Sequence, residues 1–449
     1  MQEQPPVKAS PAMPTIFHPK HPAYTVRPIS PRELPWMLRR NIWTGVLGAV
    51  AMGFLVGGPF FIAYCRNMGM TDEMFGWLTM LSTLMVLGSI LAGALEEYFG
   101  HRKYPFFILA MASRIVLAPM LLGLFLTVSP GTIIAMVVAS TALSQLSSPL
   151  WVSWVWDYVP RENLGRFWAR RNMWATLGRM AVALAGAAAV RSVPDEHETQ
   201  ILCGIFALLL VAGIVDLLFH VHIPEPPRAA APSRSLAKIR EAFRNAPLRN
   251  LMLAVTLWHF ALMISGPFSL PYMMGTLGFQ KSPDRLALAT VLTVVVAGLS
   301  TMCSMWAAGR LCDKTDPRLV AVTCYFFWAV IPLFYFLAPP LAPVPIMVVS
   351  WTFTGMFPAA AGVAVTLLVE RFSGADKTMP AALMTIMPLA VGATLGSVLG
   401  TLIVRYFGTR AAFGVSFAAR SAVAFAIVLL LLYFPWRERR RRRPHPQTP

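Results

Sequence analysis

Charged residues are scarce in this chain of 449 residues. They make up 13% of it, and 56% of its residues are hydrophobic, whereas soluble proteins average about 25% charged residues. This balance excludes an ordinary soluble fold. Residues 1–40 contain no apolar run that could serve as a secretory signal, so none is expected. The five cysteines form no CxxC pair, which argues against a disulfide framework and favours small apolar packing residues.

Motifs for catalysis inside a membrane are missing as well. The eight histidines form neither HxxxH nor HExxH, and no DDxxD occurs. The sequence therefore predicts no enzyme, no catalytic residue, no metal site and no cofactor. A sensor or scaffold normally carries an added soluble domain, but the two tails together hold only about 55 residues.

Long apolar runs fill most of the chain. Twelve of them are long enough to cross a bilayer, which takes roughly 20 helical residues. They predict an all-α integral membrane protein with twelve transmembrane helices. The expected spans are 42–65, 75–95, 104–127, 132–158, 172–191, 201–222, 250–275, 285–308, 319–338, 344–369, 381–404 and 411–434.

The basic residues between these spans are distributed unevenly. Of the 38 Lys and Arg residues, 29 fall on the side of the two tails, six on the other side and three inside spans. Because cytoplasmic loops carry the excess of Lys and Arg, both termini are expected in the cytoplasm. A bacterial inner membrane is the expected location.

The spans and tails predict five parts. They are a disordered cytoplasmic tail at 1–40, a six-helix bundle at 41–222, a cytoplasmic linker at 223–249, a second six-helix bundle at 250–435 and a basic cytoplasmic tail at 436–449. In the linker, Leu236, Ile239 and Phe243 share one helix face, which favours an amphipathic helix on the membrane; a solvated linker is the alternative. The arginines of the last tail predict attraction to anionic lipids, and nucleic acid is not an expected partner.

Two internal repeats relate the halves of the chain. Gly93–Lys103 has a degenerate copy at Gly309–Arg318, and Gly57–Tyr64 matches Ser265–Tyr272. Parallel repeats of this kind are typical of transporters, with the substrate site at the repeat interface. The sequence therefore predicts two pseudo-symmetric halves.

With these repeats the chain resembles the major facilitator superfamily over about residues 40–435. The loop of that family reads Gly-x-Leu-Ala-Asp-Arg-x-Gly-Arg-Arg, and its counterparts here are Gly93, Leu95, Glu97, Gly100, Arg102 and Lys103. The resemblance implies secondary active or facilitative transport of a small organic solute by alternating access, in a monomer. A non-transporting, receptor-like or scaffold protein derived from a transporter is the alternative.

The resemblance also implies a gate at these loops. Its candidate residues are Gly93, Glu97, Gly100, Arg102, Asp157, Arg166, Gly309 and Asp313. Glycines without a Cβ let helices approach closely, and one at position 100 permits a tight turn. Contacts of Arg102, Arg166 and Glu97 are expected to latch the two halves together on one side. Alternatively, the basic residues only set the topology.

Four charged residues lie deep inside predicted spans, away from the span ends, where charge is costly and marks functional candidates. They are Arg114, Arg179, Asp216 and Arg420. Asp216 can pair with Arg114 or Arg179, and Arg420 can be satisfied by backbone carbonyls. The excess of arginine makes an anionic solute one hypothesis, beside a sugar-like one.

By the resemblance, spans one, four, seven and ten line a substrate cavity. Their candidate residues are Gln145, Trp151, Trp154, His259, Tyr272, Trp351 and Phe357. Aromatic walls with a few polar groups suit a small organic solute. An imidazole near mid-span can carry a proton, so His259 is a candidate for proton coupling; a structural histidine is the alternative.

Overall fold

The computed structural model describes His18 and residues 24–160, 164–227, 240–241, 243–338, 343–372 and 383–433. At positions 93, 97, 156, 164–166, 169 and 195 the description is limited to the backbone. The regular structure of the described residues is almost entirely helical, and twelve of their segments are long and apolar enough to cross a membrane. Each predicted span overlaps one of these segments, so the predicted fold class is confirmed.

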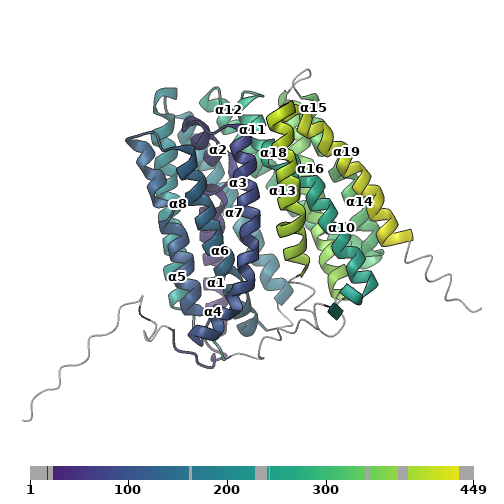
Figure 1. Ribbon diagram of the computed structural model, residues 1–449. Helices are drawn as coiled ribbons and strands as arrows, with labels where there is room; N and C mark the ends of the chain where they lie inside the picture. The colour runs from purple at the N-terminus through teal and green to yellow at the C-terminus, as the bar shows by residue number, and fades with distance from the viewer. Residues whose placement is uncertain are drawn as a thin grey trace, which may run out of the picture.

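The first six spans form one bundle, drawn in purple to teal in Figure 1. Its elements are α1 (Leu34–Leu55), α2 (Gly58–Asn67), α3 (Asp72–Leu84), η2 (Met85–Leu91), α4 (Ala92–Phe99), α5 (Lys103–Ile115), η3 (Ala118–Leu124), α6 (Pro130–Tyr158), α7 (Leu164–Arg191), η5 (Asp195–His197) and α8 (Glu198–Val221).

The last six spans form the second bundle, drawn in green to yellow. Its elements are α10 (Ala246–Met263), α11 (Gly266–Gly275), α12 (Pro283–Thr290), η6 (Val291–Val296), α13 (Ala297–Lys314), α14 (Pro317–Ala329), α15 (Ile331–Leu337), α16 (Pro343–Phe372), η7 (Met387–Ala393), α18 (Thr394–Phe407), α19 (Thr409–Val428) and η8 (Leu429–Tyr433).

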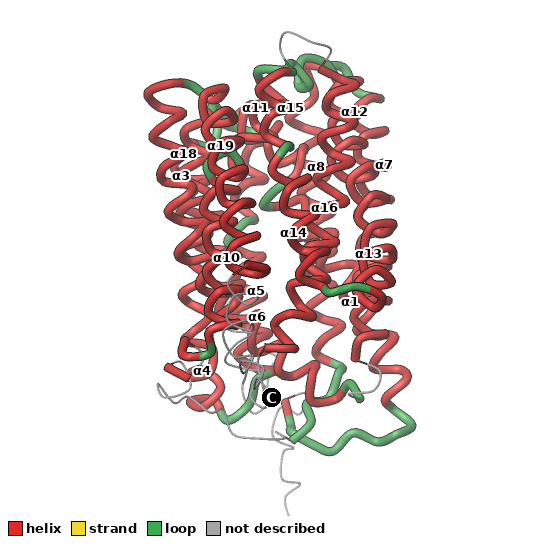
Figure 2. The backbone as a smooth tube through the Cα atoms, turned by 90° about the vertical axis from the view of Figure 1, so that its right-hand side faces the viewer, coloured by secondary structure: helices red, strands yellow, loops and turns green. Residues whose placement is uncertain are grey.

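The two bundles meet along two helix pairs. Helix α3 packs against α18 and α11, and α7 packs against α12 and η6. Because the number of spans is even, Leu34 and Tyr433 lie at the same side of the membrane region, which we call the terminal face. The other side, which carries the α2–α3 and α11–α12 connections, is the opposite face (Figures 1 and 2).

Spans one and seven are both broken near their middle. Helix α1 ends at Leu55, and α2 begins at Gly58, whose φ of 78° is in the left-handed region that glycine tolerates. In span seven, α10 ends at Met263 and α11 begins at Gly266, and Ile264 and Ser265 between them have negative φ. Each new helix has a proline in its first turn, where the missing N–H is not needed. The Gly-Pro-Phe repeat therefore marks the same break in both halves.

The amino-terminal tail is shorter than the sequence predicted. Helix α1 already begins at Leu34, and Tyr24 is only 3% exposed. The Tyr24 ring packs edge-on against Tyr104 at 5.1 Å, and Val26 forms a parallel bridge with Glu225. These contacts bury an aromatic ring and pair backbone groups, which is why residues 24–33 hold a defined position on the terminal face.

Most of the predicted linker helix and the basic tail at 436–449 lie outside the described residues. In the linker, residues 240–241 and 243–244 are helical, and Phe243 is exposed. Leu236 and Ile239 belong to the part that is not described, so the amphipathic helix stays a prediction.

Candidate functional site

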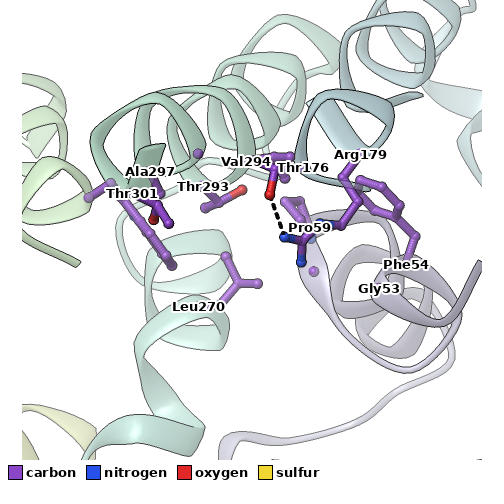
Figure 3. Close-up of a pocket in the computed structure, with 13 residues that line it drawn as sticks. Gly53, Phe54, Pro59, Thr176, Arg179, Leu270, Thr293, Val294, Ala297 and Thr301 are labelled. Carbon is purple, nitrogen blue, oxygen red and sulfur yellow. Dashed lines mark hydrogen bonds between the residues drawn. The ribbon is translucent and has the colours of Figure 1, made fainter. Parts of the chain in front are cut away.

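A cavity of about 370 Å³ lies between the two bundles near the middle of the membrane region. Both halves of the repeat contribute to it, including both broken spans (Figure 3). Its lining residues are Gly53, Phe54, Gly58, Pro59, Thr176, Arg179, Leu270, Thr293, Val294, Ala297, Gly298, Thr301 and Trp351.

Arg179 is the single charged residue among those that line this cavity. It lies in the middle of α7, and its side chain is exposed to the cavity. Its Nη2 donates to Thr176 Oγ1, one turn earlier on the same helix, at 3.3 Å. In Figure 3 the guanidinium extends towards Pro59, at the start of α2. The cavity therefore has one cationic end.

The other two arginines predicted inside spans are buried in the interior of a bundle. Arg114 Nη2 lies 3.9 Å from Asp216 Oδ2, and both side chains are less than 10% exposed. His220 Nδ1 lies 3.3 Å from the other oxygen of Asp216. Of the two pairings predicted for Asp216, the structure forms the one with Arg114, within the first bundle.

Arg420 is satisfied by uncharged groups of the second bundle. Its Nη2 donates to the backbone oxygen of Leu262 at 3.1 Å and to Ser265 Oγ at 3.2 Å. The side chain therefore fastens α19 to the break in span seven and does not face the cavity.

Of the seven residues predicted to line a cavity, Trp351 lines this one, and its Nε1 donates to Met273 Sδ at 3.2 Å. Phe357 stacks on Phe327 with ring centroids 5.0 Å apart, and Tyr272 packs on Phe413 at the same distance. These two aromatic residues belong to the packing of the second bundle.

The other four predicted residues lie away from the cavity lining. Trp154 donates to the backbone oxygen of Pro224 at 3.1 Å, and Trp151 donates to His220 Nε2 at 3.1 Å. His259 Nδ1 bonds the oxygen of Val255, one turn earlier, at 2.8 Å. Gln145 lies on α6, which contributes no lining residue.

The sequence does contain a signal for the lining residues that were missed. Paired Gly/Pro interruptions at corresponding positions of two transporter halves mark the binding site, because non-helical backbone is tolerated inside a membrane where it borders a cavity. Gly57-Gly58-Pro59 and Ser265-Gly266-Pro267 are such a pair.

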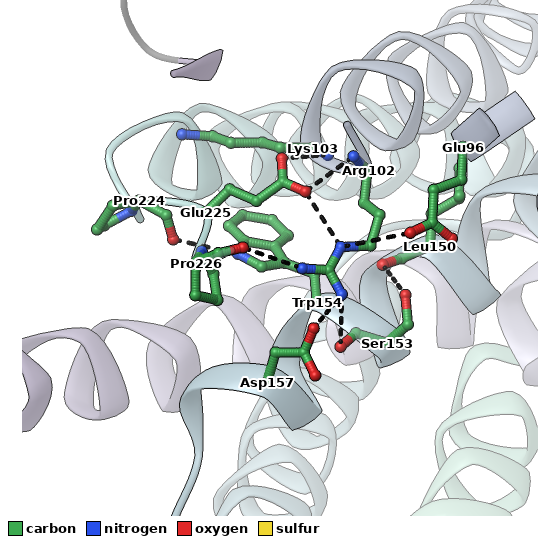
Figure 4. A network of polar contacts seen from close by, with 10 residues as sticks. All are labelled: Glu96, Arg102, Lys103, Leu150, Ser153, Trp154, Asp157, Pro224, Glu225 and Pro226. Carbon is green, nitrogen blue, oxygen red and sulfur yellow. Dashed lines mark hydrogen bonds and ion pairs between the residues drawn. The ribbon is translucent and has the colours of Figure 1, made fainter. Parts of the chain in front are cut away.

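A second polar site holds the predicted gating residue Arg102 on the terminal face (Figure 4). Its Nη1 pairs with Asp157, and its Nε lies 3.1 Å from Glu225 Oε1. The backbone N–H groups of Arg102 and Lys103 donate to the same Glu225 carboxylate at 2.9 and 3.1 Å. Burial lowers the pKa of Arg102, but the hydrogen bonds to Asp157 and Glu225 outweigh it and raise the pKa above its usual range.

Every one of these partners belongs to the first bundle or to the residues directly after it. Among the described residues, therefore, the contacts of Arg102 do not cross to the second bundle. Gly100 ends α4 with a φ of 72°, as the tight turn requires. The side chains of Glu97 and Arg166 lie outside the description, and Gly93 is described by its backbone position alone.

The second copy of the motif makes looser contacts than expected. A Cβ added to Gly309 would meet no atom within 4 Å, so close helix approach does not explain this glycine. Asp313 is exposed. Asp316, which replaces the glycine of the first copy, caps α14 by accepting from the N–H of Arg318 at 3.0 Å.

Polar contacts between the bundles occur at the opposite face. Arg66, at the end of α2, pairs with Asp72 and also donates to the backbone oxygen of Pro271 at 2.7 Å. Asp72 accepts from Thr409 Oγ1 at 2.7 Å. Gln280 donates to Asn67 Oδ1 across the same boundary at 2.8 Å. We call Arg66, Asp72, Pro271 and Thr409 the outer latch.

Comparison with known proteins agrees with this architecture. The model of the Major Facilitator Superfamily matches residues 42–341 and 269–449. No curated protein matches the sequence.

Solved structures share the fold at low sequence identity. The nucleoside transporter NupG has a TM-score of 0.66 and 12% identity, over 89% of this chain and 99% of its own. The inward-open xylose transporter XylE from E. coli has a TM-score of 0.65 and 14% identity, over 88% of this chain and 95% of its own. A bacterial homolog of the human lysosomal transporter Spinster, in an inward-facing and unoccupied conformation, has a TM-score of 0.63 and 16% identity, over 93% of this chain and 100% of its own.

Proposed function

Because this chain belongs to the Major Facilitator Superfamily, a family of membrane transporters, we propose that it carries a small organic anion by alternating access of its two bundles. The observation that supports this substrate class is the position of Arg179. It is the one charged group in the cavity lining, and it lies in the middle of α7.

A charge at this depth is costly and persists where a function requires it. The described hydrogen bond of Arg179 to Thr176 uses one of the five N–H donors of a guanidinium. The others can bind a carboxylate in the bidentate manner that arginine favours. The positive end of the α2 dipole adds to this attraction, because Gly58 and Pro59 border the same cavity.

The contacts between the bundles suggest which state this conformation represents. The outer latch joins the bundles at the opposite face, whereas the Arg102 network stays within the first bundle and its exit. The excess of Lys and Arg supports a cytoplasmic terminal face. We therefore propose an inward-facing state in a cell membrane of the bacterial inner-membrane type, with both termini in the cytoplasm.

Uptake into proteoliposomes tests the proposed substrate class. Small carboxylates, sugars and nucleosides are offered to the unmodified protein and to Arg179→Gln. Loss of a charge-assisted hydrogen bond should raise KM for the anion about 10- to 100-fold, and Arg179→Lys should recover part of the loss. Arg170→Gln is the matched control, because this arginine of the same helix is exposed and does not line the cavity.

The proposal fails if anion uptake is unchanged in Arg179→Gln or if only neutral solutes are transported. No uptake of any solute, together with solute-dependent thermal stabilisation, would favour the receptor-like alternative. The same vesicles with an imposed pH gradient distinguish proton-coupled from facilitated transport.

A further inference from the structure

The cavity wall formed by η6 and α13 carries a row of small residues. Thr293, Ala297 and Thr301 all line the cavity and follow one another at intervals of four residues, so they share one helix face. Eight helical residues rise about 12 Å. In Figure 3 this row lies across the cavity from Pro59 and the start of α2. The wall therefore presents two hydroxyls along the length of a small solute.

Both hydroxyls have already donated their single proton. Thr301 Oγ1 donates to the backbone oxygen of Gly355 at 3.0 Å, and Thr293 Oγ1 donates to that of Thr290 at 3.4 Å. A threonine hydroxyl has one proton and two lone pairs. The groups that remain available to a solute are therefore hydrogen-bond acceptors. The indole N–H of Trp351 is also engaged, with Met273.

This wall is held at a fixed place by tight helix contacts. A Cβ on Gly355 would come within 2.2 Å of the backbone oxygen of Ala297, so α16 lies directly against α13. On the other side, a Cβ on Gly298 would lie 3.1 Å from Met180 Sδ and 3.5 Å from Thr176 Cγ2 of α7. The hydroxyl row and the helix of Arg179 thus keep a defined separation. The π-helical turn η6 in this wall is a feature found at functional sites.

The two ends of the cavity consequently differ in chemistry. One offers the donors of Arg179, and the other offers the lone pairs of Thr293 and Thr301. We propose, building on the proposed function, that the solute is a hydroxylated organic anion of the sugar-acid type. Its carboxylate binds Arg179, and its hydroxyl groups donate to Thr293 and Thr301. An unsubstituted carboxylate has no donor for these acceptors.

Three probes separate the contributions of charge and hydroxyl groups. Gluconate has both, hexanoate has the charge and a similar chain length, and glucose has hydroxyls without charge. Binding to the purified protein is measured by calorimetry and thermal stabilisation. Since one hydrogen bond changes affinity about fivefold, gluconate should bind at least about tenfold more tightly than hexanoate through two such bonds.

Threonine variants assign this preference to the wall. Thr293→Val keeps the side-chain shape and should weaken gluconate about fivefold without changing hexanoate. Thr301→Val should have the same effect. If loss of its bond to Gly355 also loosens the wall, the binding of both gluconate and hexanoate should weaken. In that case Thr293→Val decides whether the hydroxyls bind the solute, because the bond of Thr293 stays within span eight and joins no other helix to the wall. Thr366→Val is the control, because its hydroxyl donates to Gly362 of α16 outside the cavity lining.

Each result has one consequence. Equal binding of gluconate and hexanoate, both lost in Arg179→Gln, overturns this inference and leaves the proposed function intact. Glucose binding that survives Arg179→Gln overturns the proposed function and with it the inference. No binding of gluconate, or gluconate binding that Thr293→Val leaves unchanged, also overturns the inference.

Discussion

Arg66 and Asp72 form an ion pair across the connection between α2 and α3, and the same guanidinium also donates to the backbone oxygen of Pro271 in the other bundle. One side chain thus ties the first two spans of the first bundle to the break-containing span of the second. In the proposed alternating-access cycle the bundles separate at this face, so these bonds would break in each cycle.

Weakening the outer latch should open the opposite face. Asp72→Asn removes the ion pair and weakens the bond to Thr409, which should raise the population of the open state about 5- to 10-fold. Cys65 is fully buried beside Arg66, so the rate at which an impermeant thiol reagent labels it reports this opening. Arg191→Gln provides the comparison. Its pair with Asp284 also joins the two bundles at this face, but both side chains are 70% exposed, and such pairs contribute little. Equal labelling of Asp72→Asn and the unmodified protein would argue against a latch.

The Arg114–Asp216 pair should matter for stability. Removing one partner of a buried ion pair leaves an uncompensated charge and costs about 3 kcal/mol or more, whereas replacing both is far better tolerated. We expect Asp216→Asn and Arg114→Met to lower the melting temperature in detergent, and the double variant to regain part of the loss. Additive losses would show that the two residues do not interact.

Glu225 should hold the amino-terminal segment through the terminal-face network. Its carboxylate accepts from the backbone N–H groups of Arg102 and Lys103, and its own backbone oxygen accepts from the N–H of Arg27. Glu225→Ala leaves the buried Arg102 with Asp157 as its principal ion-pair partner. Hydrogen exchange of residues 24–33 should become faster. Glu196→Ala, whose exposed carboxylate lies beside His197 in η5, is the control for the loss of a carboxylate outside this network.

Two glycine substitutions on α16 should show whether close helix packing, and not merely the presence of a glycine, is needed for stability. Gly355→Ala places a Cβ 2.2 Å from the backbone oxygen of Ala297, whereas Gly362→Ala on the same helix meets no atom within 4 Å. Overpacking costs about 1–3 kcal/mol, so only Gly355→Ala should lower the melting temperature and change transport. Gly309→Ala should behave like Gly362→Ala, and a large loss there would restore the close-approach explanation for the second motif.

Several features of this protein could be predicted from the sequence because they depend on local properties of the chain. Span number follows from the length and apolarity of each run, and the twelve expected spans all overlap spans in the structure. The turn at Gly100 needs a residue that accepts positive φ, and Pro59 and Pro267 mark breaks because proline lacks an N–H. The family resemblance rested on such local motifs, and the family is confirmed.

The direction in which each side chain points was decided by the tertiary structure alone. Arg114 and Arg179 have the same chemistry and both lie inside predicted spans, yet one pairs with Asp216 inside a bundle and the other faces the cavity. Spans that are apolar on every side have no hydrophobic stripe to indicate which face is inward, so their rotation depends on contacts with distant helices. For the same reason Trp351 reaches the cavity while Trp154 is buried away from it. The sequence determined which segments can cross the membrane, and the packing of the helices determined which residues line the cavity.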